Sequence, residues 1–267
     1  MRRRNGLIWG AAGGLAWCGP PALAADSVIR VCIDDSPHPP WRVPDADGRL
    51  RSRGLEFDYL HMLGAETGLR LQPLVQPWRR CLSDVRSGDV DAVMAISHQR
   101  DREAFIRYPM RDGEPDPARA VRQIQNVLVV AADAAANWDG QHLHLQGGKQ
   151  IGIQAGYATA TWVREQGFKV DETARTVRGT LERLLGRQVQ AVLLSRTAFL
   201  HQLQQEPSLQ PRLRMLAPSL PARVHYLGLS SAFAQRHPEL PELLWSAGVR
   251  VRESAEFRKA ETEAMNS

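Results

Sequence analysis

Strand-like and helix-like segments alternate along this chain from Val28 onward, and this order limits the possible folds more than any other feature. The apolar run Val28 to Ile33 predicts a strand, and apolar residues at helical spacing predict a helix from Gly54 to Gly68. Leu69 to Val75 predicts a second strand, and Pro77 suits the first turn of a helix that ends before Gly88. Val90 to Ile96 is almost continuously apolar, which is typical of a strand covered on both faces. The pattern predicts an α/β fold with a parallel sheet and crossover helices.

A second unit repeats the alternation after a polar segment, Arg111 to Arg122, which contains two prolines and a glycine. Strands are expected at Ile124 to Ala131, Gln150 to Gln154 and Val189 to Leu194, helices at Ala158 to Gln166 and Thr180 to Leu185, and a loop-rich stretch at Asp133 to Gly148. Val224 to Leu229 then predicts a returning strand, followed by helices to about Met265. Two α/β units are therefore expected, with the C-terminal part rejoining the first.

The N-terminus has the three-part layout of a secretory signal peptide. Arg2, Arg3 and Arg4 precede a short apolar stretch, and Ala22-Leu23-Ala24 supplies the small residues that a signal peptidase needs. We expect residues 1–24 to be removed and the protein to be periplasmic. A lipoprotein would use Cys18, but the bulky Trp17 before it is unfavourable, and a short membrane anchor is the remaining alternative.

The net charge of the chain and its length indicate which partners and which domain arrangement to expect. Loss of residues 1–24 removes three of the 34 basic residues and none of the 29 acidic ones, which leaves a net charge of +2. Because the basic side chains are scattered, with few aromatics between them, no nucleic-acid partner is expected. The remaining length suits one large domain or two lobes.

Two cysteines remain after the expected cleavage, Cys32 in the first strand and Cys81 in the second helix. In an oxidising compartment an even pair indicates one disulfide. Two separate buried thiols are the alternative.

Motifs for catalysis and metal binding are scarce in this sequence. It contains no nucleophile elbow, no phosphate-binding loop and no dinucleotide fingerprint. His142 and His144 lack the further ligands of a metal site, so we interpret them as a surface pair and expect neither metal nor cofactor.

Polar residues directly after the predicted strands are the best candidates for a ligand site, since open α/β sheets bind ligands there. Asp35 and Trp41 follow the first strand and offer a carboxylate and a flat apolar face, or else form a packed turn. Ser97 and Arg100 follow the third strand, where an arginine can bind a carboxylate with two parallel hydrogen bonds, unless it is a solvated surface residue. In the second unit, backbone N–H groups at a helix start are offered by Gly156, Tyr157, Ala158 and Thr159.

Several of these segments together resemble the family 3 periplasmic solute-binding proteins, the amino-acid-binding type that serves ABC transporters. The resemblance covers essentially all of the chain after the signal peptide. The matching segments are Pro39-Pro40-Trp41, Gly54 to Leu60, Trp78 to Ala92, the arginine motif Ala95 to Arg100, and Ile106 to Met110. The string Pro77 to Leu82 also resembles a branch of the family that has a cysteine at the positions of both Cys32 and Cys81.

Departures from the family pattern concern the ligand. Where amino-acid-binding members carry an aspartate for the ligand's amino group, this chain has Ser195. Gln190 replaces another usual aspartate, and Ala95 lacks the hydroxyl of the first threonine in the arginine motif. Arg100 therefore favours an acidic ligand, while the missing aspartate is unfavourable for an ordinary α-amino acid.

By the resemblance, the fold is the two-lobed type II periplasmic binding protein fold, with two crossover hinge strands. Lobe 1 would comprise residues 25–122 and 222–267, and lobe 2 residues 123–221. A small ligand would bind between the lobes, with Trp78 and Ser195 added to its contacts, and a monomer would present it to an ABC transporter permease without catalysis. The alternatives are an enzyme on the same fold, similar to cyclohexadienyl dehydratase, and a sensory or accessory ligand-binding protein.

Overall fold

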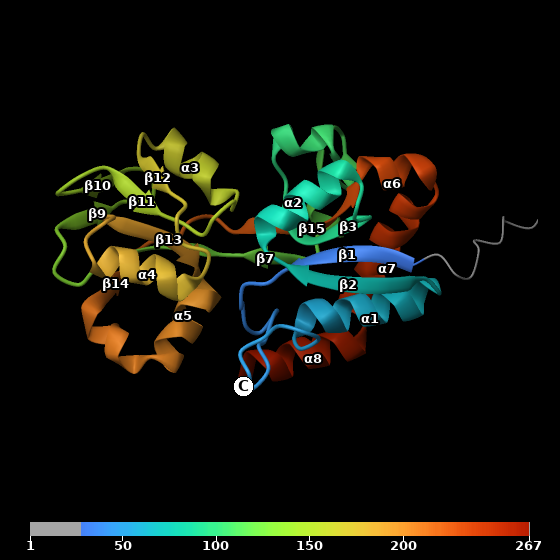
Figure 1. Ribbon diagram of the computed structural model, residues 1–267, viewed down its shortest axis with the longest axis horizontal. Helices are drawn as coiled ribbons and strands as arrows, with labels where there is room; N and C mark the ends of the chain where they lie inside the picture. Colours follow the sequence, from blue (N-terminus) through green and yellow to red (C-terminus); the bar gives the residue numbers. More distant parts are fainter. Residues whose placement is uncertain (1–27, 267) are drawn as a thin grey trace, which may run out of the picture.

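The computed structural model describes residues 28–266, so the signal peptide expected over residues 1–24 lies outside the described residues. Two mixed α/β units lie side by side, each with its own sheet and helices (Figure 1). This confirms the α/β class and the two units expected from the alternating pattern.

The first sheet has the strand order β2-β1-β3-β15-β4, with β7 also paired to β15. Its strands are β1 (Val28–Asp34), β2 (Arg70–Gln76), β3 (Ala92–Ser97), β4 (Ile106–Arg107), β7 (Arg122–Ile124) and β15 (Arg223–Ser230). The neighbours β2, β1 and β3 are parallel, as expected, whereas β15 runs antiparallel to β3. The last long strand of the chain therefore closes the first sheet.

Helices cover both faces of this sheet. They are α1 (Leu55–Thr67), α2 (Trp78–Ser87), α6 (Ser231–Arg236), α7 (Leu240–Glu253) and α8 (Ala255–Asn266). Helix α2 begins after Pro77 and ends at Gly88, whose φ of 82° is favourable only for glycine, as the sequence predicts. Helix α1 packs against α7 and α8 beneath the sheet.

The second sheet has the order β12-β11-β13-β8-β14. Its strands are β8 (Asn126–Ala131), β11 (Gln150–Gly152), β12 (Lys169–Asp171), β13 (Ala191–Ser195) and β14 (Leu213–Met215), and its helices are α3 (Thr159–Glu165), α4 (Val177–Leu185) and α5 (Arg196–Gln205). The stretch expected to be rich in loops contains a hairpin, β9 (Ala136–Trp138) with β10 (Leu143–Leu145). Trp138 and Leu143 are buried under this sheet, and their burial explains why the hairpin forms.

Shorter elements complete the chain. They are the 3₁₀ helices η1 (Arg100–Ala104), η2 (Pro117–Arg119) and η3 (Pro207–Arg212), and the strand pair β5 (Met110–Arg111) with β6 (Glu114–Pro115). Among the described residues, no helix combines the length and apolar character needed to cross a membrane.

Two stretches of chain connect the sheets, one between β7 and β8 and the other between β14 and β15 (Figure 1). They lie side by side, because Arg223 pairs with Ile124 and His225 pairs with Arg122 in an antiparallel ladder. The connections therefore place two arginines and a histidine between the two units.

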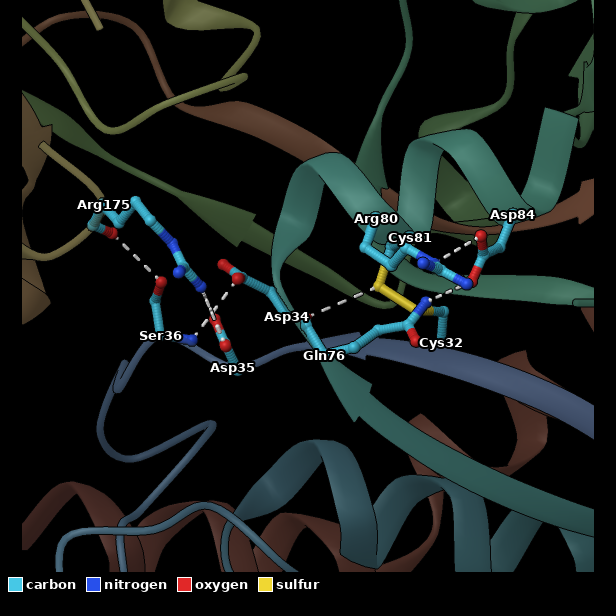
Figure 2. The surroundings of a disulfide bond; sticks show 9 residues. All are labelled: Cys32, Asp34, Asp35, Ser36, Gln76, Arg80, Cys81, Asp84 and Arg175. Carbon is cyan, nitrogen blue, oxygen red and sulfur yellow. Dashed lines mark hydrogen bonds and ion pairs between the residues drawn. A yellow bond between two sulfur atoms is a disulfide. The ribbon is translucent and has the colours of Figure 1, made fainter. Parts of the chain in front are cut away.

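Cys32 and Cys81 form a disulfide, as the cysteine count predicts, so the alternative of two separate thiols is wrong (Figure 2). The bond joins β1 to α2, and both cysteines are fully buried. It fixes the start of α2, and therefore Trp78, relative to the end of β1.

Candidate ligand-binding site

A cavity of about 640 Å³, counted with the solvent at its mouth, lies between the two units. The first unit contributes Asp34, His38, Arg42, Trp78, Ala95, Ser97, Arg102, Arg122, Arg223 and His225, and the second unit Asn126, Gln154, Tyr157, Ala158, Thr159, Leu193, Leu194 and Ser195, with Ile124 between them. Polar and charged side chains from the ends of β1, β3 and β13 thus meet in one space.

Arg42 and Arg122 form a buried ion-pair cluster at one side of the cavity. The Glu56 Oε1 atom lies 3.3 Å from Arg42 and 2.9 Å from Arg122, and Arg42 also lies 3.4 Å from Asp34 Oδ2. All four side chains are at most 4% exposed. Glu56 and Asp34 together thus balance the charges of two guanidinium groups whose isolated burial would be very costly.

Arg122 nevertheless keeps unused donor capacity. Its Nε atom is buried and has no hydrogen-bond partner among the described residues. Burial lowers the pKa of Arg122 to about 10, although Glu56 opposes this shift. At neutral pH the group is still a cation, and it lies 4.8 Å from the ring centroid of Trp41.

Arg102 and Arg223 form a second cationic group, and they donate hydrogen bonds to carbonyl oxygens and, from Arg102, to the Tyr108 hydroxyl. Arg102 is 5% exposed and donates to the carbonyls of Ser97 (3.2 Å) and Gly156 (3.4 Å). Arg223 is partly buried and donates to the carbonyl of Ala158 (3.3 Å). Burial lowers the pKa of both arginines. Neither forms an ion pair with a carboxylate in the part of the chain described here, so an anion in the cavity would be strongly attracted.

Two histidines of the cavity are neutral. The pKa of His38 lies well below 6.5, first because of burial and then because of Arg122. The pKa of His225 is lowered in the same way, and its Nδ1 atom is buried without a partner. His38 Nε2 lies 3.1 Å from Ser195 Oγ. The position that lacks the expected aspartate therefore offers a neutral hydroxyl and imidazole.

Hydrogen bonds between the units close the cavity. The Tyr157 hydroxyl donates to Asp34 Oδ2 over 2.7 Å, and Trp78 Nε1 donates to the Gly156 carbonyl over 3.0 Å. Gly156 has a φ of 79°, and a Cβ atom there would lie 3.2 Å from Trp78. Glycine is therefore required for this close approach.

A second set of contacts between the units involves Asp35 and Ser36, which follow β1 (Figure 2). Arg175 of the second unit forms an ion pair with Asp35 at 3.0 Å, and Ser36 Oγ donates to the Arg175 carbonyl at 3.1 Å. The structure is thus a closed form in which both units contact each other around the cavity.

Six of the predicted site residues line this cavity, namely Trp78, Ser97, Tyr157, Ala158, Thr159 and Ser195, while Gly156 accepts the hydrogen bond from Trp78 at its edge. Asp35 does not line the cavity, because it pairs with Arg175 and lines a separate hollow between the units. Trp41 does not line it either, because its ring is buried in the core beside Arg122.

Arg100, expected to bind the ligand's carboxylate, is also outside the cavity. It is the first residue of η1 and is exposed, whereas Arg102 in the same short helix folds back over the carbonyl of Ser97. The turn of η1, and not the end of β3 alone, therefore determines which of the two arginines lies in the cavity.

Sequence reasoning missed Arg42, Arg102, Arg122 and Arg223 as well as both cavity histidines. One signal was present, because Arg122 and Arg223 fall in the two segments expected to cross between the lobes. Across residues 28–266, no group of three or more histidine, cysteine, aspartate or glutamate side chains could hold a metal ion. The surface pair His142 and His144 lies on and beside the β9–β10 hairpin, where His142 contacts Asp139.

Comparison with known proteins gives a family and a fold. The sequence profile of the bacterial extracellular solute-binding proteins, family 3, matches residues 29–263. Comparison with curated proteins gives no match.

Solved structures similar to this chain cover nearly all of it at low identity. An ancestral arginine-binding protein bound to arginine has 17% identity and a TM-score of 0.69, with 89% of this chain and 97% of that chain covered. An amino acid ABC transporter substrate-binding protein from Streptococcus pneumoniae, bound to L-arginine, has 17% identity and a TM-score of 0.66, with coverages of 90% and 94%. A histidine kinase sensor domain with similarity to periplasmic binding proteins has 16% identity and a TM-score of 0.69, with coverages of 89% and 95%. The fold is therefore the two-lobed type II periplasmic binding protein fold.

Proposed function

The chain belongs to the bacterial extracellular solute-binding proteins of family 3, and we propose that it captures a small, carboxylate-bearing solute in the periplasm for an ABC transporter. The observation that carries this proposal is the excess of arginines around the cavity. Within residues 28–266, Arg102 and Arg223 have carbonyl and hydroxyl partners but no carboxylate partner, and Arg122 has an unused Nε donor. A carboxylate would supply the missing charge and the missing acceptors.

Capture would occur by closure of the two lobes around the solute. We propose that residues 25–122 and 222–267 move relative to residues 123–221 about the two connections, as in a hinge. Two hydrogen bonds would then form only in the closed state, one from Tyr157 to Asp34 and one from Trp78 to Gly156. A ligand that contacts both lobes shifts the population towards that state.

Binding without turnover is the simplest use of this site. Among the described residues, the only carboxylate that lines the cavity is that of Asp34, which is already engaged by Arg42 and Tyr157 and is therefore poorly placed as a general base. An ABC transporter permease is the proposed partner, and the protein would act as a monomer after removal of its signal peptide. The amino acid ABC transporter substrate-binding protein from Streptococcus pneumoniae has a similar fold, and this similarity of fold is its only support for the proposed partner.

Titration calorimetry with small carboxylates, on the purified protein and on Arg102→Gln, tests this function. A charge-assisted hydrogen bond contributes about 1.5–3 kcal/mol. Loss of the Arg102 contact should therefore weaken carboxylate binding by roughly 10-fold to 150-fold.

Arg100→Gln is the matched control, because Arg100 lies two residues away and is exposed outside the cavity. Its affinity should equal that of the unchanged protein. Equal affinities of Arg102→Gln and Arg100→Gln, or failure of every carboxylate to bind, would refute the proposal. Steady conversion of a bound acid to a product would instead favour the alternative of an enzyme on the same fold.

A further inference from the structure

Charges around the cavity do not balance. Three arginines that are at most 5% exposed, Arg42, Arg102 and Arg122, face two buried carboxylates, Asp34 and Glu56. Arg223, partly buried, adds a fourth positive charge at the cavity wall. The two cavity histidines add none at neutral pH, because the pKa of each lies well below 6.5. The closed site therefore has an excess of two positive charges, and uncompensated buried charge is costly.

These arginines form two pairs. Arg42 and Arg122 share Glu56, whereas Arg102 is close enough to Arg223 for the charge of Arg223 to lower its pKa. His225 lies within the field of all four, since each of them lowers its pKa. The cavity wall thus contains two cationic pairs with His225 near both, and each pair can receive its own anionic group.

Each pair also offers donors to such a group. At the first pair, Arg122 Nε is a buried donor without a hydrogen-bond partner within residues 28–266. At the second pair, Arg102 and Arg223 form hydrogen bonds to carbonyl oxygens, and Arg102 also bonds to the Tyr108 hydroxyl, but neither arginine has a carboxylate partner within residues 28–266. Buried donors of this kind are normally satisfied, so an acceptor that binds here would remove a large penalty.

An ammonium group would meet one carboxylate of the described residues in this cavity, Asp34, and both oxygens of Asp34 already accept hydrogen bonds. Asp34 Oδ1 accepts from the Ser36 N–H at 3.3 Å, and Asp34 Oδ2 accepts from Tyr157 and Arg42. Ser195, at the second-unit end of the cavity, already contacts His38. A buried cation beside four arginines would be repelled and unpaired.

We propose that the ligand is a dicarboxylate without an amino group, with one carboxylate at the Arg42–Arg122 pair and the other at the Arg102–Arg223 pair. This inference rests on the proposed function, because it specifies the solute that the same cavity captures. A dicarboxylate balances the charge excess and meets both sets of unused donors.

The test is a matched ligand series, titrated by calorimetry into the purified protein at pH 7.5. Malonate, succinate and glutarate are each compared with the monocarboxylate of the same carbon count, propionate, butyrate and valerate. L-Aspartate and L-glutamate are the amino-substituted forms of succinate and glutarate. We expect at least one dicarboxylate to bind at least about tenfold more tightly than its monocarboxylate and than its amino-substituted form.

Variants locate the second carboxylate. In Arg102→Gln the advantage of the dicarboxylate over its monocarboxylate should fall below about threefold, and in Arg100→Gln it should be unchanged. Equal binding of monocarboxylates, or tighter binding of the amino acids, overturns the inference and leaves carboxylate capture intact. Failure of all eight acids to bind overturns both proposals.

Discussion

Glu56 offers a sharp test of the buried charge cluster, because one carboxylate oxygen serves two arginines. Glu56→Gln keeps the size of the side chain and removes its charge, so Arg42 and Arg122 would remain as buried cations with only Asp34 nearby. Removing one partner of a buried ion pair destabilises a protein by about 3–5 kcal/mol. For a chain of this size, that loss should lower the Tm by roughly 6–20 °C.

Glu66→Gln is the matched control within the same helix, α1. Glu66 also pairs with an arginine, Arg250 at 2.6 Å, but these side chains are 40% and 55% exposed. Exposed pairs contribute about 0–1 kcal/mol, so this variant should unfold within a few degrees of the unchanged protein.

Thermal unfolding followed by circular dichroism, without ligand and at pH 7.5, gives both values. Equal Tm values for Glu56→Gln and Glu66→Gln would show that the arginines do not depend on Glu56 for compensation. The count of charges around the cavity would then be wrong, and with it the reason for expecting a dianion.

Three further predictions concern other parts of the structure. Tyr157→Phe removes the 2.7 Å bond to Asp34 that joins the lobes, so ligand affinity measured by calorimetry should fall by roughly 10-fold, and an unchanged affinity would contradict a role in closure. Replacement of both Cys32 and Cys81 by alanine removes a disulfide between residues that are 49 positions apart. The free energy of unfolding in urea should fall by roughly 4 kcal/mol, and an unchanged midpoint of unfolding would contradict this. The buried histidines are neutral in the folded state, while unfolding lets them take up protons below their ordinary pKa of 6.5. Their contribution to stability is therefore present above pH 6.5 and is lost as the pH falls below it, so the Tm should drop between pH 7 and pH 5, and less so in His225→Gln.

Much of the fold follows from local patterns in the sequence. Helix α2 ends at Gly88 and the buried strand β3 follows it, because a glycine stop and a continuous apolar run each act within a few residues. The disulfide was also predictable, since the two cysteines that follow the expected signal peptide have one possible pairing. The β9–β10 hairpin was not, because its burial depends on contacts with the rest of the second unit.

The site was predictable only in part. Strand ends predicted Ser97 and Tyr157, which line the cavity, since β-strand carboxyl ends meet at one edge of a sheet. The choice between Arg100 and Arg102 depends on the turn of η1, which no periodicity specifies. Glu56 also pairs with Arg122, which lies 66 positions later in the sequence, and only the folded chain brings these two side chains together.

Native mass spectrometry of the protein purified from its source tests the central claim most directly, because it weighs whatever the closed cavity holds. We predict one small organic acid per chain, released on denaturation and absent from Arg102→Gln. A basic amino acid bound at the same ratio would contradict the account, since a cavity that holds a cation cannot have the excess positive charge described here.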